Sequence, residues 1–506
     1  MWTGCTELFS LSNQNRVQNK WTIVDTRRIM PRLIASLVFA LGIAVLFWLD
    51  REPKARTSKA LWIPTLWLFI AASRNVSDWL QMSSSGGASD YTEGSPLDRA
   101  VLTAIMSVGV IVLVNRGRRI WTLLCSNAPI LLFFAYCAIS ILWSDFPDIA
   151  VKRWFRALGD VVMVLIVLSD RDWIIAFRRL LARLGFLLVP LSILFIRYYP
   201  DLGRRYSRGG RFFWVGVATD KNALGMLCLI VGLAAMFRFL VVYGEDKSAA
   251  RKRILIAQGA LIAMTVYVLR EADSATAFSC FGLAGSVMVL TFLFRWARKP
   301  QALHVMVAAV LSVAFSALFL GVGSGLVEDL GRESTLTGRT AIWESAIKLV
   351  SNPLMGTGYE SFWIGPRLRH VERDIHQGVN QAHDGYLEIY LNLGWVGVAL
   401  LVGLIVTGYR RIIAAVRRQI QAGNLRLAYF IVTIAYNFTE GGFKMMHPVW
   451  ILFLLTISVA PRYPFLQSKK IAADSARTLA EMPTGVPDPA EPETTWTDFA
   501  TGQAGL

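Results

Sequence analysis

The chain has 506 residues, of which 54% are hydrophobic and 17% are charged. Soluble domains have about 25% charged residues, so this composition excludes an ordinary soluble protein and indicates many membrane-spanning helices. In a soluble protein the net charge of +17 would suggest nucleic-acid binding. Membrane proteins collect Lys and Arg in their cytoplasmic loops, however, so we expect no nucleic-acid partner.

Thirteen apolar runs follow one another along the chain, at about 33–49, 61–73, 98–115, 127–143, 157–169, 180–196, 222–242, 254–270, 275–294, 302–321, 386–408, 426–439 and 447–460. Five of the connections between them are rich in Lys and Arg, at 116–119, 171–183, 247–253, 295–299 and 410–426. The positive-inside rule makes these five connections cytoplasmic. They recur at every second connection, which predicts an alternating topology with a cytoplasmic C-terminus.

The first two apolar runs leave two topologies open. The run 61–73 is short and contains Pro64, while Arg27, Arg28 and Arg32 favour a cytoplasmic N-terminus. We therefore expect an all-α, polytopic inner-membrane bundle of about 12 transmembrane helices, with both ends in the cytoplasm. If the run 61–73 crosses the membrane, there are thirteen spans and the N-terminus lies outside.

This topology divides the chain into five parts: a cytoplasmic segment 1–32, transmembrane helices in 33–321, a large periplasmic loop 322–385, the final transmembrane helices in 386–460 and a tail 467–506. The large loop precedes the third-from-last span. The tail is rich in Ala, Thr, Pro and Glu, so we expect it to be disordered and cytoplasmic. The apolar spacing in the large loop predicts one amphipathic helix, which begins near Thr337 and ends before Pro353.

One predicted periplasmic loop, 197–221, opposes the charge rule. Six basic residues against two acidic residues give it a net charge of +4; these are Arg197, Arg204, Arg205, Arg208, Arg211 and Lys221 against Asp201 and Asp220. Arginine binds phosphate oxygens through two parallel hydrogen bonds, so the loop predicts a diphosphate site at the outer face. Contact with anionic lipid headgroups is the alternative. Arg339, in the first turn of the predicted loop helix, favours the diphosphate site, although alone it is equally a surface charge.

His383 stands where the large loop becomes a membrane helix. The positive end of a helix dipole disfavours protonation of an imidazole, so His383 is a candidate neutral base, while the adjacent Asp384 acts in the opposite direction. A capping or interfacial role is the alternative. The histidines of the loop lie six and seven residues apart, and the five cysteines form no Cys-x-x-Cys pair, so we expect no metal site.

Several motifs occur in an order that resembles the O-antigen ligase and O-antigen/exopolysaccharide polymerase superfamily. In the ligase branch a His is followed by Asn, Ser or Gln, nine residues, Gly, two residues and a second Gly, Thr or Tyr. Here His383, Gly394 and Gly397 fit that pattern, and Asp384 departs from it. The other matching stretches are Ser73-Arg74 with Ser77 and Trp79, Trp143-Ser-Asp-Phe-Pro147, Lys221-Asn222 with Gly225, Thr337-Gly-Arg-Thr-Ala-Ile-Trp343, Asn352-Pro353 and Gly356-Thr-Gly358.

The resemblance covers about residues 30–460 and implies a metal-independent, inverting glycosyltransferase without a cofactor in the bacterial inner membrane. Its donor would be an undecaprenyl-diphosphate-linked glycan and its acceptor another glycan, both bound at the periplasmic face of the lipid bilayer. We expect a polymerase that joins repeats into exopolysaccharide or O-antigen, with chain-length regulator and flippase proteins as possible partners. The alternatives are a ligase that transfers the glycan to lipid A-core and a transporter or flippase for the same lipid-linked glycan.

The resemblance also assigns roles to residues. His383 would be the catalytic base. The donor diphosphate would be bound by Arg339 and by one arginine of the basic loop, with Arg211 preferred to Arg208. The expected supporting residues are Lys221, Tyr386 and Asp384.

Overall fold

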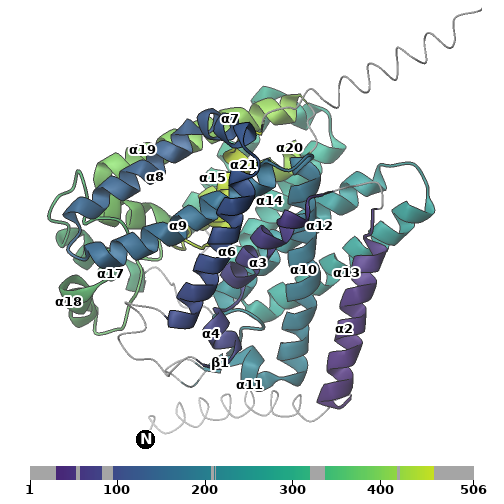
Figure 1. The fold of residues 1–506 in the computed structure, drawn as a ribbon, viewed down its shortest axis with the longest axis horizontal. Coiled ribbons are helices and arrows are strands. Elements are labelled where there is room, and N and C mark those ends of the chain that lie inside the picture. Colours follow the sequence, from purple (N-terminus) through teal and green to yellow (C-terminus); the bar gives the residue numbers. More distant parts are fainter. Residues whose placement is uncertain are drawn as a thin grey trace, which may run out of the picture. The chain divides into compact units, whose positions relative to one another are not determined.

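The computed structural model describes residues 30–52, 57–82, 95–206, 210, 212–319, 337–418 and 422–460, and the structural statements below refer to these residues. Seven helices are long and apolar enough to cross a membrane: α2 (Arg32–Leu49), α6 (Pro96–Val114), α10 (Trp173–Tyr198), α12 (Lys221–Tyr243), α13 (Ala249–Ala272), α14 (Ala275–Leu293) and α19 (Gly385–Arg417). An eighth crossing results if α7 (Arg118–Ser126) and α8 (Ala128–Ile139), which are bent by 83°, form one span. This confirms an all-α protein of the membrane type (Figure 1).

The remaining elements are shorter or more polar. The helices are α3 (Trp62–Ala72), α4 (Val76–Trp79), α9 (Pro147–Leu168), α11 (Pro200–Gly203), α15 (Pro300–Phe319), α17 (Thr337–Lys348), α18 (Gly365–Ile375), α20 (Gly423–Tyr436) and α21 (Pro448–Ile457), with 3-10 turns at Lys59–Leu61, Ser140–Trp143 and Trp296–Arg298. The strands β1 (Arg204–Tyr206) and β2 (Phe212–Trp214) form a small antiparallel hairpin in which Arg204 lies opposite Trp214.

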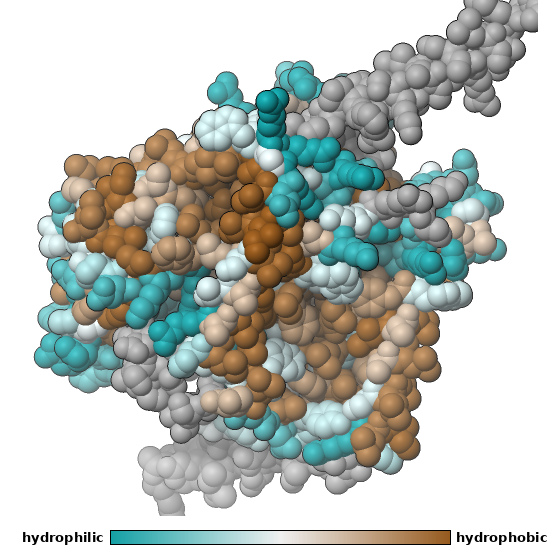
Figure 2. Space-filling model, in the orientation of Figure 1, coloured by the Kyte–Doolittle hydropathy of each residue, from teal (hydrophilic) through white to brown (hydrophobic). Residues whose placement is uncertain are grey.

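The core lies around α10, α12 and α20, whereas α2 and α6 are peripheral. In the apolar stretches of α10 and α12, 67% of the residues are buried, compared with 11% in α2 and 22% in α6. Figure 2 shows apolar side chains along the outer faces of both peripheral helices. Apolar side chains that stay exposed on the outside of a bundle indicate a lipid-facing surface, because lipid tails are as apolar as the side chains themselves.

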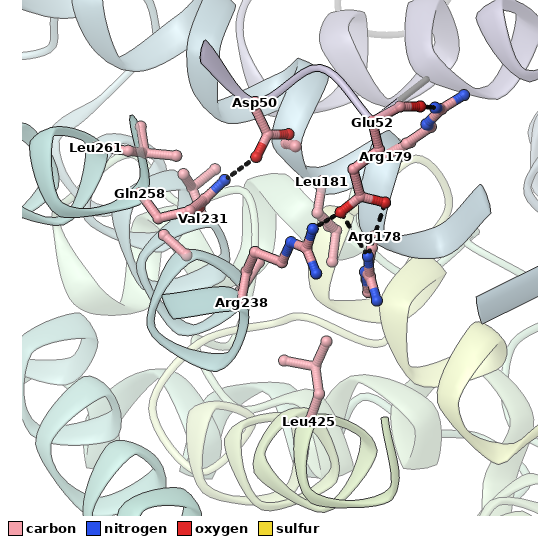
Figure 3. Close-up of a pocket in the computed structure, with 13 residues that line it drawn as sticks. Asp50, Glu52, Arg178, Arg179, Leu181, Val231, Arg238, Gln258, Leu261 and Leu425 are labelled. Carbon is pink, nitrogen blue, oxygen red and sulfur yellow. Dashed lines mark hydrogen bonds and ion pairs between the residues drawn. The ribbon is translucent and has the colours of Figure 1, made fainter. Parts of the chain in front are cut away.

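Ion pairs set the direction of α2. Just after the helix ends, the carboxylate of Glu52 pairs with Arg178 at 3.3 Å and with Arg238 (Figure 3). Asp50 accepts a hydrogen bond of 2.9 Å from Gln258. At the other end, Arg32 lies 3.5 Å from Asp201, beside the hairpin loop. The helix therefore begins at the end of the bundle that holds α11 and β1, as Figure 1 shows.

The next helix, α3, runs back in the opposite direction. The Ser58 backbone N–H, just before the helix, donates to Asp170 near the start of α10, and Arg74, just after it, donates to the carbonyl of Gly216 near the start of α12. Pro64 lies in the first turn of α3, where a missing N–H costs no helical hydrogen bond. The segment therefore connects the same two ends of the bundle as α10.

This arrangement corrects the preferred topology at the N-terminus. The 12-helix arrangement placed Arg32 and the loop 197–221 on opposite sides of the membrane, whereas the structure places them at the same end. The thirteen-span alternative has the observed direction of the first two helices. The acidic residues Asp50 and Glu52 explain the difference, because their partners on α10, α12 and α13 outweigh the preference of a few terminal arginines for the cytoplasm. The side of the membrane and the total number of spans stay predictions.

Cysteine labelling tests this topology. In a cysteine-free background, Pro31→Cys and Tyr206→Cys, both at exposed positions, should react equally with a membrane-impermeant maleimide in intact cells. Asp246→Cys, exposed in a predicted cytoplasmic connection, should react only after permeabilisation. Labelling of position 31 together with position 246, and not with position 206, would contradict the structure.

Candidate active site

The site is built around a break in α19. Gly394 has φ of 62° and ψ of −164°, so two helical segments meet there at a kink. The backbone N–H groups of Trp395 and Val396, next to the break, donate to the carbonyls of Pro353 and Leu354, at 3.0 and 3.1 Å. A Cβ at Gly394 would lie 2.3 Å from the Leu354 carbonyl oxygen. The break and the glycine thus allow the turn after Pro353 to lie directly on the helix.

A second backbone contact fixes the rest of this turn. The N–H of Gly358 donates to the Asn392 carbonyl at 2.9 Å, and the Asn392 side chain accepts from the N–H groups of Ser361 and Phe362. Ser144, from the stretch after α8, forms a hydrogen bond of 2.7 Å with Ser361. The motifs at 143–147 and 356–358 therefore belong to one docked unit.

Trp343 positions α17 against the residues before α19. Its indole N–H donates to the Ala382 carbonyl at 2.8 Å. The Ala382 N–H and the Trp363 indole both donate to Glu388, in the first turn of α19. Because Arg339 lies one helical turn before Trp343, this anchor places the Arg339 guanidinium beside the stretch that carries His383.

His383 is held in place by the two residues that follow it. It has φ of 56°. The following residue, Asp384, caps α19 by accepting from the Leu387 N–H at 2.8 Å. Gly385 donates its N–H to the Asn437 carbonyl at 2.8 Å, and a Cβ there would lie 1.9 Å from the Asn437 amide oxygen. This close approach places the end of α20 against the His383 segment.

The carboxylate of Glu440, just after α20, joins three elements. Its Oε1 accepts from the Asn222 side chain at 2.9 Å, in the first turn of α12, and lies 3.8 Å from the Arg339 guanidinium. Its Oε2 lies 3.4 Å from Nδ1 of His383. The Glu440 side chain is 9% exposed, while those of Arg339 and His383 are 20% and 33% exposed. A buried anion therefore lies beneath a cation and an imidazole that solvent reaches.

Gln381 and Lys444 complete the surroundings of the imidazole. Lys444 donates to Gln381 Oε1 at 3.0 Å, and Gln381 Nε2 lies 3.2 Å from His383 Nδ1. Arg339 adds a positive charge beside the Glu440 carboxylate, and Lys444 adds another beside Gln381. The arrangement can bind an anion and accept a proton in the same place. Among the described residues, no three His, Cys, Asp or Glu side chains converge as metal ligands would.

The expected site residues have different positions. Arg339 and His383 are brought together, with Asp384 beside them. Lys221 is the first residue of α12 and precedes Asn222. Tyr386 points into the protein, where its hydroxyl donates to the Ile434 carbonyl at 3.0 Å and its ring packs on Phe438 and Phe443. Its observed contacts hold α19 on α20.

Arg208 and Arg211 lie outside the described residues, but the flanks of their loop are described. Arg74 donates to the carbonyls of Leu202, Gly216 and Ala218 and so holds both arms of the loop. Burial lowers the pKa of Arg74. The three carbonyl oxygens accept hydrogen bonds from its guanidinium and so offset the loss of contact with water. The Arg74 motif thus supports the loop that leads to Asn222.

Sequence reasoning missed Glu440 and Asn222 as members of the site. Asn222 belongs to the Lys221-Asn222 motif, which resembles the superfamily, so the motif itself points to this residue. Glu440 lies outside every matched motif, in a short connection between two apolar runs. The sequence indicates its importance only by placing an acidic residue directly after the apolar run 426–439, where charged side chains are rare.

Residues 258–402 match the protein family described as O-antigen ligase, and both His383 and Arg339 lie within this range. The chain is 26% identical over 288 residues to the exopolysaccharide production protein ExoQ of Rhizobium meliloti (strain 1021). The aligned region covers 55% of this chain and 63% of ExoQ. It is also 21% identical over 366 residues to RC0486 of Rickettsia conorii, described as a candidate polysaccharide ligase, across 69% of this chain and 83% of that relative. The chain thus spans less than two thirds of the length of ExoQ.

A substitution at the break tests its importance. Gly394→Ala should destabilise the protein by about 2–3 kcal/mol, because the new Cβ meets a carbonyl oxygen and φ is positive. The matched control is Gly403→Ala in the same helix, where nothing lies within 4 Å, and its stability should stay near that of the wild type. The measurement is the thermal unfolding midpoint in detergent. Equal midpoints for the two variants would show that the break is not required.

Asp384 gives the stability a pH dependence. Burial raises its pKa from 3.8 to about 6, so the folded state binds the proton more tightly than the unfolded state does. Stability should therefore fall, by at most about 3 kcal/mol, as the pH rises from about 4 to 7, and change no further above that. Asp384→Asn keeps an acceptor for the Leu387 N–H but does not titrate. Its unfolding midpoint should vary less over this range, whereas an identical pH profile would contradict the assignment.

Proposed function

We propose that this protein, whose residues 258–402 carry an O-antigen ligase family domain, is a glycosyltransferase that polymerises undecaprenyl-diphosphate-linked oligosaccharide repeats. The polymer would be an exopolysaccharide or O-antigen. The observation that carries the proposal is the meeting of Arg339 and His383, from separate elements, at the carboxylate of Glu440. A group that binds anions and a group that accepts protons then lie at one site, where the first acts on the donor and the second on the acceptor.

The chemistry needs these two functions. The bond between the anomeric carbon and the diphosphate oxygen breaks, and its electron pair leaves with the diphosphate. Arg339 stabilises the negative charge that develops there, together with an arginine of the loop 197–221, for which Arg211 and Arg208 are the candidates. Because diphosphate is a good leaving group, arginines can provide this stabilisation without a metal ion or cofactor.

The acceptor supplies the new bond. Its hydroxyl oxygen attacks the anomeric carbon from the face opposite the diphosphate, so the configuration inverts. The hydroxyl proton passes to His383, whose imidazole is one-third exposed and open to the acceptor on that side. A correctly placed general base contributes about 10²- to 10⁴-fold in rate. Asp384 supports this step by capping the helix that follows, and Lys221 adds positive charge near Asn222.

The proposed setting follows from the same chemistry. The lipid tail keeps the donor in a bilayer, which suits a multi-pass membrane protein, and we place this protein in the bacterial inner membrane with its site facing the periplasm. Chain-length regulator and flippase proteins are the proposed partners. The name of ExoQ supports exopolysaccharide formation, whereas the descriptions of the family and of RC0486 favour the ligase alternative.

The product distinguishes the three functions. Deletion of a polymerase leaves single lipid-linked repeats in the cell. Deletion of a ligase leaves long polymer that is not attached to lipid A-core. A transporter or flippase moves the lipid-linked glycan across vesicles without forming a glycosidic bond.

Two substitutions test the roles within the enzyme. In membrane vesicles supplied with lipid-linked repeats, His383→Ala should reduce turnover by about 10²- to 10⁴-fold, because the general base is lost. Arg339→Ala should also lower the rate of turnover of the labelled donor, because the charge on the leaving diphosphate is less stabilised. Polymer length on gels and rates with labelled donor are the measurements.

The controls separate a chemical defect from a structural one. Both variants should insert into the membrane at wild-type levels, and Glu344→Gln, an exposed change on α17, should leave turnover unchanged. Wild-type activity should persist in EDTA. Near-normal turnover of His383→Ala would overturn the base assignment, and loss of activity in EDTA that added Mg²⁺ restores would overturn the metal-free proposal.

A further inference from the structure

The surroundings of His383 contain two groups that compete for one atom. Nδ1 of the imidazole lies 3.4 Å from Glu440 Oε2 and 3.2 Å from Gln381 Nε2. A carboxylate oxygen only accepts hydrogen bonds, whereas an amide nitrogen only donates them. The same nitrogen of a neutral imidazole cannot satisfy both, because it either carries the proton or presents a lone pair.

The two partners select opposite tautomers. If Nδ1–H donates to Glu440, then Nε2 presents its lone pair and can accept a proton. If Nδ1 accepts from Gln381, then Nε2 carries the proton and cannot act as a base. The choice of tautomer therefore decides whether His383 can serve as the base of the proposed function.

The neighbouring contacts fix the direction of each partner. Asn222 donates to Oε1 of Glu440, which leaves Oε2 for the imidazole. Lys444 donates to Oε1 of Gln381, which turns the amide nitrogen toward the imidazole. Neither group can change its role without losing its own hydrogen bond.

We propose that Glu440 is a positioning residue that selects the reactive tautomer of His383 against the competing hydrogen bond of Gln381. This inference rests on the proposed function and adds a residue to it. Glu440 accepts from Nδ1–H, and Nε2 takes the acceptor hydroxyl proton. The carboxylate then stabilises the imidazolium that forms, as a buried carboxylate does beside the catalytic histidine of hydrolase triads. Asn222 supports this geometry by holding the other carboxylate oxygen.

Glu440 variants should lose turnover without losing donor binding. Hydrogen bonds to charged groups are strong, so Glu440→Ala should lower kcat by about 10- to 100-fold, with the KM for donor changed by less than about threefold. Glu440→Gln should be at least as damaging despite its smaller change in shape. Asn222 would hold the new amide oxygen, so that the new amide nitrogen faces Nδ1 and favours the inactive tautomer.

The second variant distinguishes tautomer selection from a structural role. Adding Gln381→Ala to Glu440→Ala removes the group that favours the inactive tautomer, so kcat should recover by about fivefold. If Glu440 only held the fold together, removal of another contact would leave the double variant equal to or worse than the single one. In a His383→Ala background, Glu440→Ala should add little further loss, because the two residues act as a unit.

The assay is turnover of labelled lipid-linked repeats in membrane vesicles, with thermal unfolding in detergent as the measure of folding. Glu344→Gln is the matched control and should behave as the wild type. The inference alone fails if His383→Ala is inactive while Glu440→Ala and Glu440→Gln keep near-normal kcat. It also fails if the Glu440 variants raise the KM for donor at unchanged kcat, which would assign Glu440 to Arg339 instead. If His383→Ala is fully active, both the inference and the proposed general base are wrong.

Discussion

The backbone pairing at the break in α19 is the constraint on which the candidate site depends. A continuous helix offers no free N–H groups on its side, so a loop can lie on it only through side chains. At Gly394 the helix opens, and two N–H groups reach the chain at Pro353 and Leu354. The loop that carries α17 is then held by backbone contacts to the helix that begins beside His383. Arg339 and His383 come from segments more than forty residues apart, yet they share one support.

Buried carboxylates organise this end of the bundle. Glu388 accepts hydrogen bonds from the N–H groups of Ala382 and Trp363. Glu440 accepts a hydrogen bond from Asn222 and lies beside Arg339 and His383. Asp160 of α9 accepts hydrogen bonds from the Trp67 indole and the Met446 backbone. A buried carboxyl group is costly unless hydrogen-bond partners surround it, so each one fixes the position of the groups that stabilise it. The connection between α20 and α21 is thereby held at both Glu440 and Met446. Polar groups define the geometry here, and apolar packing alone would leave it less specific.

The sequence predicted the class of fold from its apolar runs and a loop helix from its apolar spacing. The family motifs suggested Arg339 and His383 as site residues, and the structure brings both to Glu440. The helix expected from Thr337 is α17. The direction of α2 was wrong because it depends on Glu52 meeting Arg178 and Arg238, a contact that charge counting along the chain does not detect. Glu440 was missed for the same reason, since its importance arises only where three distant segments converge. The roles of Arg208 and Arg211 stay predictions.

The ion pairs at the end of α2 also have a consequence for how the protein is made. The partners of Glu52 on α10 and α12 are synthesised more than a hundred residues after it, so they cannot guide the helix when it first leaves the ribosome. With only 11% of its apolar stretch buried, α2 gains little from early packing. The contacts that hold its direction in the folded protein can therefore form only once α10, and then α12, have been synthesised.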